Sequence, residues 1–292
     1  MKKIIISVGL CLGIVFAAAA QDLTSENPAL VNKRGISLLP EAGDFAIGVE
    51  ATPFLEYLGN FFNGSNSNDA PVFNGVDNKI YGKYFLDNDR AIRAKLRLNF
   101  YENQNKGTVA NDTEVTNNPL NSAATIVDVQ RLKTQDVDLY IGYEFRRGHG
   151  RVQGFYGAEV GFGYGGGKAV YEYGNEMTLL NQTPSSMNFG ANIPVAGGRV
   201  TESKFGTELR ASVAGFVGVE YFFAPQISIG GELNLGFVYS TLGQTENVLE
   251  QYDAASNQIQ TIKSRSRDNS DLAGTAGVQT KYYGNIFLMF HF

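Results

Sequence analysis

The sequence predicts an all-β fold in which eight antiparallel strands close into one up-and-down transmembrane β-barrel. Apolar and polar side chains alternate along eight segments, and a period of two is the pattern of a β-strand with one apolar face. The connections between these segments are alternately short and long, as in an antiparallel meander. Beyond the first 20 residues the chain has no run of about 18 apolar residues, so membrane-spanning helices are excluded.

The eight predicted strands cover residues 44–53, 78–86, 90–103, 134–145, 152–165, 207–223, 227–240 and 275–292. The third strand shows the pattern most clearly, because Ile92, Leu96 and Phe100 lie on one face while Arg93 and Arg97 lie on the other. One face of each strand would therefore meet lipid and the other would meet the barrel interior.

The connections predict how the strands are arranged. Three are tight turns at residues 87–89, 147–150 and 224–226, and they consist mainly of residues that favour turns. Four are long and polar, at about residues 55–77, 104–133, 166–206 and 241–274. A meander places all short turns at one end and all long loops at the other, and an even number of strands brings both termini to the short-turn end. Ten strands would require a hairpin within residues 166–206, where residues 170–173 could only extend the fifth strand.

The first 20 residues have the pattern of a secretory signal peptide. Lys2 and Lys3 precede an apolar run over residues 4–16, and three alanines at residues 18–20 suit a cleavage site. We expect residues 1–20 to be removed, residues 21–43 to form an N-terminal segment, and residues 44–292 to form the barrel. Cys11 is the only cysteine, so the processed chain would contain no disulfide.

Composition agrees with a membrane barrel and argues against nucleic acid as a partner. The chain has 34 glycines, 20 phenylalanines and 15 tyrosines but no tryptophan, and its mean hydropathy is only −0.15. Such a moderate value suits strands with one face toward lipid and the other toward a polar interior. The net charge is −5, and removal of Lys2 and Lys3 takes it to −7, which disfavours a polyanionic partner.

The inner face of the predicted barrel collects charged residues of both signs. The predicted lumen network comprises Glu50, Arg93, Lys95, Arg97, Asp136, Asp138, Glu144, Glu159, Glu208, Arg210, Glu220 and Glu232, with Lys79 and Lys83 on the same face. A Gly-x-Glu repeat begins at Gly48, Gly142, Gly157, Gly218 and Gly230, and we expect these glycines to make room for packed Arg and Glu side chains. An eight-stranded barrel is narrow, so the network is predicted to fill it as a plug, with a narrow ion path as the alternative.

The last strand carries a further pattern. Counting back from the end, alternate positions are apolar, aromatic or glycine: Phe292, Phe290, Leu288, Ile286, Gly284 and Tyr282. The segment resembles the C-terminal strand of bacterial outer-membrane β-barrels. This resemblance implies that Tyr282, Ile286, Leu288, Phe290 and Phe292 form the signal that the barrel-assembly machinery recognises.

The whole strand and loop plan is similar to the OmpA transmembrane domain and to OmpX-like barrels. The entry sequence at residues 38–44 and the Gly-x-Glu strands also resemble small outer-membrane barrels of the Bacteroidota. These resemblances imply a Gram-negative outer membrane, with short periplasmic turns, periplasmic termini, residues 21–43 in the periplasm and four long extracellular loops. The partners they imply are outer-membrane lipid, lipopolysaccharide, the assembly machinery and an unidentified extracellular ligand or outer-membrane complex.

The sequence predicts no catalytic, cofactor-binding or metal-binding residue. Both histidines, His149 and His291, fall at the predicted short-turn end, away from the loops where a His-dependent lipid-modifying enzyme would act. Without Cys in the processed chain and without a His cluster, a transition-metal site lacks ligands. The leading interpretation is a non-enzymatic barrel with a structural or surface-interaction role. The alternatives are a narrow porin or channel for small solutes or ions and, less favoured, a lipid-modifying enzyme.

Overall fold

The computed structural model describes residues 37–51, 54–55, 57, 79–118, 120, 123–189, 198–265 and 277–292. Residues 1–20, most of residues 21–43 and nearly all of the predicted loop 55–77 lie outside this part, so the signal peptide stays a prediction. The described residues form one antiparallel sheet of eleven strands together with the short helix α3 (Asp112–Asn117). Within these residues, no helix is both long and apolar enough to cross a membrane.

The strands follow the chain in this order: β1 (Phe45–Glu50), β2 (Lys79–Asp87), β3 (Arg90–Ala110), β4 (Thr125–His149), β5 (Val152–Glu172), β6 (Gly198–Lys204), β7 (Glu208–Ala224), β8 (Ile227–Leu242), β9 (Glu246–Asp253), β10 (Gln258–Arg265) and β11 (Gly277–His291).

Eight of these strands form a closed ring in the order β1-β2-β3-β4-β5-β7-β8-β11. The ring closes between the first and last strands, where Ala46 pairs with His291 and Glu50 pairs with Phe287. All pairings in the ring are antiparallel. The predicted all-β fold with eight antiparallel strands in a ring is therefore confirmed, and the ring has no open edge where β1 pairs with β11.

Tight turns join the ring strands at residues 88–89, 150–151 and 225–226. Two of them lie where the sequence predicts them. The middle turn lies later than predicted, because β4 continues to His149 and the chain reverses at Gly150. Gly150 has a φ of 77°, a conformation that glycine adopts readily and most other residues do not.

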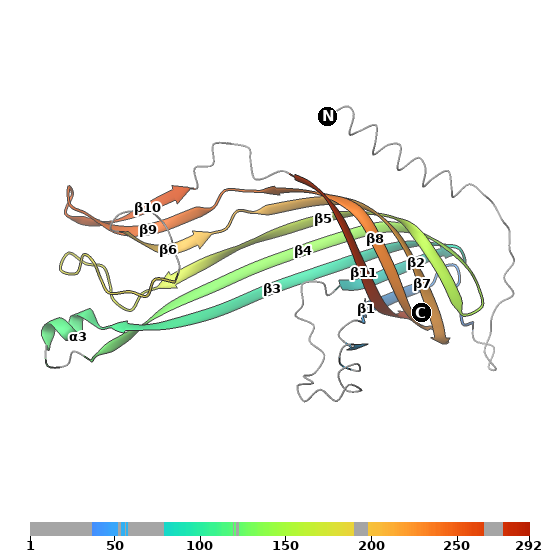
Figure 1. The fold of residues 1–292 in the computed structure, drawn as a ribbon, viewed down its shortest axis with the longest axis horizontal. Helices are drawn as coiled ribbons and strands as arrows, with labels where there is room; N and C mark the ends of the chain where they lie inside the picture. Colours follow the sequence, from blue (N-terminus) through green and yellow to red (C-terminus); the bar gives the residue numbers. More distant parts are fainter. Residues whose placement is uncertain are drawn as a thin grey trace, which may run out of the picture.

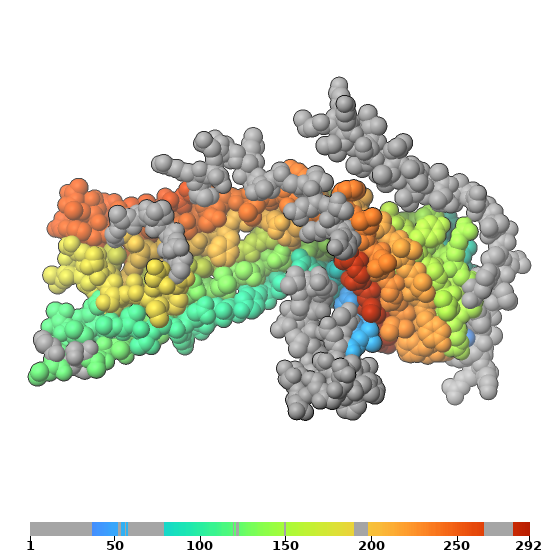
Figure 2. All heavy atoms as spheres, viewed as in Figure 1, coloured from blue at the N-terminus to red at the C-terminus, as the bar shows by residue number. Residues whose placement is uncertain are grey.

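Three ring strands continue beyond the ring into an extension of the same sheet (Figure 1). The outer ends of β3, β4 and β5 reach Ala110, Thr125 and Glu172, and β6, β9 and β10 join them in the order β3-β4-β5-β6-β9-β10. Figure 2 shows the ring and the extension as one elongated body. About half of the segments 104–133 and 241–274 and both ends of the segment 166–206 are therefore strands, so the prediction that these residues are loops is wrong.

The physical reason for this difference is that both faces of the extension are largely polar. Asn103, Asn105 and Gln130, for example, occupy its strands, and the Asn105 amide donates to Gln130 across β3 and β4 at 2.9 Å. Backbone ladders and such cross-strand pairs stabilise these strands. The sequence period of apolar residues detects only strands with an apolar face.

The ring is joined to the extension by a bend in one long hairpin. β6 runs into β7 and β8 runs into β9, and the register is the same on both sides of the break, with Lys204 opposite Glu246 and Glu208 opposite Leu242. At the break, a Cβ atom on Gly206 would overlap the carbonyl oxygen of Gly243, so this close approach requires glycine. β6 pairs with β5 and β9 outside the ring, so it adds no strand to the ring.

Part of the predicted loop 166–206 folds back over the end of the extension. The buried Asp128 carboxylate accepts a hydrogen bond from the Met187 N–H at 2.6 Å. Partial burial raises the pKa of the Asp112 carboxyl, but hydrogen bonds from the Asn181 side chain and from Ser185 outweigh this effect and hold the pKa below its ordinary value. These contacts give the polar end of the molecule a defined local structure.

The outward face of the ring is apolar on all eight strands. Its exposed side chains are Phe45, Ile47, Ile80, Tyr84, Leu86, Ile92, Leu98, Phe100, Leu139, Ile141, Val152, Val160, Phe162, Tyr164, Leu209, Val217, Val219, Tyr221, Phe223, Leu233, Leu235, Phe237, Tyr239, Ile286, Phe290 and Phe292. We call this set the apolar belt. The intervening side chains point inward and are mostly buried, so the alternation predicted from the sequence is present in the ring.

Candidate functional site: the charged interior and its cavity

The interior of the ring contains charged side chains that meet from strands not adjacent in the sheet. Nearest the tight turns, Lys83 of β2 and Arg146 of β4 lie between the carboxylates of Glu144 and Glu220. The Lys83 Nζ is 3.0 Å from Glu144 and 3.2 Å from Glu220, and the Arg146 Nη1 is 2.9 Å and 2.8 Å from the same two groups. Because β7, which carries Glu220, is not a neighbour of β2 or β4, these contacts cross the interior.

A second group of ion pairs lies on the side away from the tight turns. The Arg93 Nη2 atom is 2.6 Å from Glu232 and 3.5 Å from Glu159. The Nη1 atom of the same side chain is 3.5 Å from Glu144. The Lys95 Nζ is 2.7 Å from Glu159 and 3.2 Å from Glu232. Each of the eight charged side chains in the two groups is at most 3% exposed.

These two groups together are electrically balanced. Their four cations are Lys83, Arg93, Lys95 and Arg146, and their four carboxylates are Glu144, Glu159, Glu220 and Glu232. Removing charges from water costs several kcal/mol per ion, and only close pairing with further hydrogen bonds offsets that cost. We call this balanced set of eight the buried cluster.

A third group lies nearer the extension and is partly exposed. Arg97 and Arg210 both bind Asp138, and Arg210 also contacts Asp136 at 2.7 Å and Glu208 at 2.7 Å. The two cations face three carboxylates here. Solvent reaches this group, since Asp136 is 31% exposed and Glu208 is 37% exposed. We call these five residues the rim cluster.

Eleven of the twelve predicted lumen residues fall into these two clusters. The twelfth, Glu50, is buried and accepts hydrogen bonds from the Tyr81 hydroxyl at 3.1 Å and from the Ile286 N–H at 3.2 Å. The prediction named Lys83 on the inner face and missed Arg146. The missed residue lies two positions after Glu144, on the same face, so extending the strand period by one residue would have identified it.

Three of the five glycines in the Gly-x-Glu repeat make room for aromatic rings, which corrects the expectation that these glycines accommodate Arg and Glu. A Cβ atom on Gly157 would overlap the ring of Phe216, which lies directly opposite it in the β5–β7 ladder. Gly230 bears the same relation to Phe287 in the β8–β11 ladder. Only Gly142, of the five repeat glycines, lies against charged side chains.

The aromatic rings in turn support the cations of the buried cluster. The Arg93 guanidinium carbon lies 3.8 Å from the centre of the Phe216 ring, and the Lys83 Nζ lies 4.6 Å from the centre of the Phe155 ring. Gly218 lies directly opposite Phe155 in the ladder. Cation–π attraction adds about 0.5–2 kcal/mol in such settings. At Phe216, Phe155 and Phe287, a glycine thus lies opposite the ring and a cation lies over it.

His291 lies in the interior at the tight-turn end, beside Ser228 and Glu220. The His291 Nε2 is 2.9 Å from the Ser228 hydroxyl oxygen, and this hydroxyl is 2.5 Å from Glu220. In a hydrolytic triad the carboxylate binds the other ring nitrogen and orients the imidazole. Here Glu220 lies on the serine side, and Ser228 is fully buried, so a substrate carbonyl cannot reach its hydroxyl.

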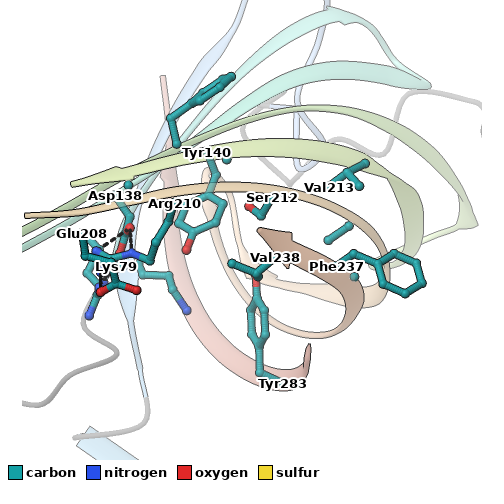
Figure 3. Close-up of a pocket in the computed structure, with 16 residues that line it drawn as sticks. Lys79, Asp138, Tyr140, Glu208, Arg210, Ser212, Val213, Phe237, Val238 and Tyr283 are labelled. Carbon is teal, nitrogen blue, oxygen red and sulfur yellow. Dashed lines mark hydrogen bonds and ion pairs between the residues drawn. The ribbon is translucent and has the colours of Figure 1, made fainter. Parts of the chain in front are cut away.

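A cavity of about 540 Å³ lies beside the rim cluster, and Arg97, Asp138, Glu208 and Arg210 of that cluster line it (Figure 3). Tyr140 and Tyr283 line it together with Lys79, and small residues such as Gly161 and Ser212 contribute to its wall. Toward the tight turns the buried cluster closes the interior. The cavity is large enough for a small polar molecule. Among the described residues, no group of three or more His, Cys, Asp or Glu could hold a metal ion.

The predicted assembly-signal residues occupy the outward face of β11 and the terminal position. Ile286, Phe290 and Phe292 are exposed, and Leu288 is half-buried. The Phe292 carbonyl accepts from the Phe45 N–H at 3.1 Å, which pairs the end of the chain with β1. The side chain of Tyr282 lies outside the described part of the structure. Recognition by assembly machinery stays a prediction.

No protein-family model matches the chain, and no curated protein matches it. Among solved structures it is similar to the outer membrane protein OprG from Pseudomonas aeruginosa, with 11% identity over 87% of this chain and 98% of that chain and a TM-score of 0.30. It is also similar to a major outer membrane protein from Thermus thermophilus, with 12% identity over 86% of this chain and 100% of that chain and a TM-score of 0.34. At these scores the likenesses carry no argument about function.

The glycine–ring pairs predict opposite outcomes for two adjacent glycines. Gly230→Val places methyl groups in the Phe287 ring, whereas Gly231→Val adds them where the nearest atom to a Cβ is 3.8 Å away. Overpacking a filled interior costs about 1–3 kcal/mol. We expect the Gly230 variant to lower the urea midpoint of unfolding in lipid vesicles and the Gly231 variant to change it little. Equal losses in the two variants would contradict the inferred packing.

The buried cluster predicts that loss of one carboxylate destabilises the ring strongly. Glu232→Gln leaves Arg93 and Lys95 buried with fewer counter-charges, and breaking a buried pair typically costs about 3–5 kcal/mol. The matched control is Glu172→Gln, which removes an exposed partner of Arg131 and should have little effect. Equilibrium unfolding in urea measures both. A Glu232 variant as stable as the control would show that the cluster is not electrostatically coupled.

Proposed function

We propose that the chain is an integral outer-membrane β-barrel without enzymatic activity, whose interior is sealed and whose extension forms a surface for interactions outside the cell. The apolar belt around a closed ring is the observation that carries this proposal. A water-soluble protein rarely exposes one continuous apolar surface of this size. A closed ring in lipid also satisfies every backbone group of its strands, which an open sheet cannot do.

The dimensions of the belt fit a bilayer. On β3 the outward face is apolar from Ile92 to Phe100, between Arg90 at one end and Glu102 at the other. A tilted strand needs about 9–11 residues to cross the hydrocarbon core. An Arg or Lys side chain facing lipid at the middle of the bilayer would cost about 2–4 kcal/mol. The charged residues on the outward face of β3 lie only at the two ends of the apolar stretch, which supports placing the belt in the bilayer.

The sealed interior favours a structural or surface-interaction role over conduction. Ions crossing the ring would have to pass the buried cluster, where the side chains of Lys83, Glu144 and Glu220 are at most 2% exposed and bind one another directly. Separating such pairs exposes unpaired charges in a narrow interior. The cavity is then a pocket beside the rim cluster and is not part of a continuous path through the ring.

The proposed orientation places the extension outside the cell and the tight turns in the periplasm. The polar strands beyond the belt and the folded-back segment at their end supply a large, defined surface for contact with another molecule. The resemblance of the last strand to those of outer-membrane barrels supports periplasmic termini and recognition of Ile286, Leu288, Phe290 and Phe292 by assembly machinery. The predicted signal peptide supports export.

Planar-bilayer recording tests the sealed interior. Purified full-length protein in bilayers should give no large, stable conductance, because the buried cluster fills the ring. Liposome swelling with small sugars should likewise be absent. A stable conductance whose ion selectivity changes with Glu220→Gln or Lys95→Gln would instead establish a channel through the cluster.

Surface labelling tests the orientation. Single cysteines are introduced at Ala254, in the turn between β9 and β10, and at Asn88, in the turn between β2 and β3, in a chain whose Cys11 is removed with the signal peptide. On intact cells a membrane-impermeant maleimide should label Ala254→Cys, while Asn88→Cys should react only after permeabilisation. Labelling of Asn88→Cys alone on intact cells would invert the proposed topology.

A further inference from the structure

A row of lysines crosses the outward face of the sheet just beyond the apolar belt. Lys133 of β4 is directly opposite Lys168 of β5, and Lys168 is directly opposite Lys204 of β6. Side chains opposite each other in neighbouring antiparallel strands share a face, with Cβ atoms about 4.5–5.5 Å apart. The three lysines therefore stand side by side, and each is about half exposed. We call them the lysine row.

Like charges in direct cross-strand contact destabilise a sheet, and the carboxylates nearby compensate only part of this repulsion. Glu102 lies 3.1 Å from Lys133. Lys168 and Lys204 share one carboxylate, Glu202, at 4.0 Å and 3.6 Å. Glu246 lies directly opposite Lys204 in the β6–β9 ladder, but it pairs with Arg265 at 3.1 Å. Exposed pairs at such distances contribute little. An additional anion beside Lys168 and Lys204 would relieve the remaining repulsion.

The position of the lysine row relative to the belt indicates which anion fits. On β5, the outward positions before Lys168 are Phe162, Tyr164 and Gly166, and Phe162 and Tyr164 are exposed members of the belt. The Tyr164 hydroxyl accepts a hydrogen bond from the Gln135 amide at 3.5 Å, so the ring has an apolar body and a polar tip. Tyrosines of this kind mark the interface between hydrocarbon and headgroups. The lysine row thus lies at headgroup depth.

We propose that Lys133, Lys168 and Lys204 bind the phosphate groups of an anionic lipid in the adjoining membrane leaflet, with its acyl chains against Phe162 and Tyr164. The inference rests on the proposed membrane location. Ammonium groups form charge-assisted hydrogen bonds with phosphate oxygens, and a phosphate between two lysines converts their repulsion into attraction to a shared anion. Apolar side chains directly below supply the matching surface for acyl chains. A lipid with two phosphates, such as lipid A, fits a row of three cations.

Native mass spectrometry of the detergent-solubilised full chain tests the proposal. The probes are lipid A, phosphatidylglycerol, phosphatidylcholine with the same acyl chains, and inorganic phosphate. We expect the unmodified protein to bind lipid A more tightly than phosphatidylcholine. In the triple variant with Lys133→Gln, Lys168→Gln and Lys204→Gln, the dissociation constant for lipid A should be at least tenfold larger. Inorganic phosphate alone should bind weakly, because it lacks the acyl chains.

Lys106→Gln is the matched control. Lys106 is an exposed lysine on the same outward face of β3, four residues beyond Glu102 and therefore about 13 Å farther from the belt. The control should retain lipid A like the unmodified protein. An equal loss in the control, or no loss in the triple variant, would overturn the proposal.

Lys168→Gln provides a second readout that does not require the triple variant to fold. Removing the central lysine should raise the urea midpoint in neutral detergent, because like-charge repulsion is relieved. The same substitution should lower the midpoint in vesicles that contain lipid A, because a phosphate contact is lost. A shift of the same sign in both media would contradict the proposal. Failure of the protein to insert into vesicles would count against the proposed membrane location, whereas insertion without this reversal would count against the lysine row alone.

Discussion

Between the tight turns and the cavity, the eight-stranded ring encloses so little space that inward side chains pack against one another and buried charges have to be paired. The buried cluster meets both demands with four cations and four carboxylates whose side chains are at most 3% exposed. Because its members come from β2, β3, β4, β5, β7 and β8, the ion pairs hold opposite walls of the ring together. Loss of one partner leaves a charge that the interior cannot solvate, so the pairs depend on one another.

The strand ladders decide how this interior is packed. A glycine opposite a phenylalanine, as at Gly157 and Phe216, lets the ring cross the neighbouring strand and support Arg93. The same alternation that directs these groups inward directs apolar side chains outward and so produces the belt. Close packing of the buried cluster and exposure of the belt are therefore two consequences of one pattern. The proposed non-conducting membrane barrel with an external sheet follows from the two together.

Features that repeat every second residue could be predicted from the sequence, whereas features that depend on register could not. The ring strands and the inward direction of Arg93, Lys95 and Arg97 follow from local alternation. The alternation predicts that the fourth strand ends at Phe145, so it does not identify Arg146. The polar strands of the extension carry no apolar period, so the sequence predicts loops there. Cross-strand partners such as Gly230 with Phe287, and the lysine row itself, join residues far apart in the chain and need the ladder to be known.

A double-mutant cycle on Lys95 and Glu159 tests the central claim most directly. Their charged atoms are 2.7 Å apart and both side chains are 1% exposed. Unfolding free energies are measured in lipid vesicles for Lys95→Met, for Glu159→Gln, for the double variant and for the unmodified protein. If the ion pairs hold the interior together, each single variant loses several kcal/mol, and the double variant is more stable than the sum of the two losses predicts by about 1–3 kcal/mol. Strictly additive losses would contradict a coupled, mutually neutralising interior.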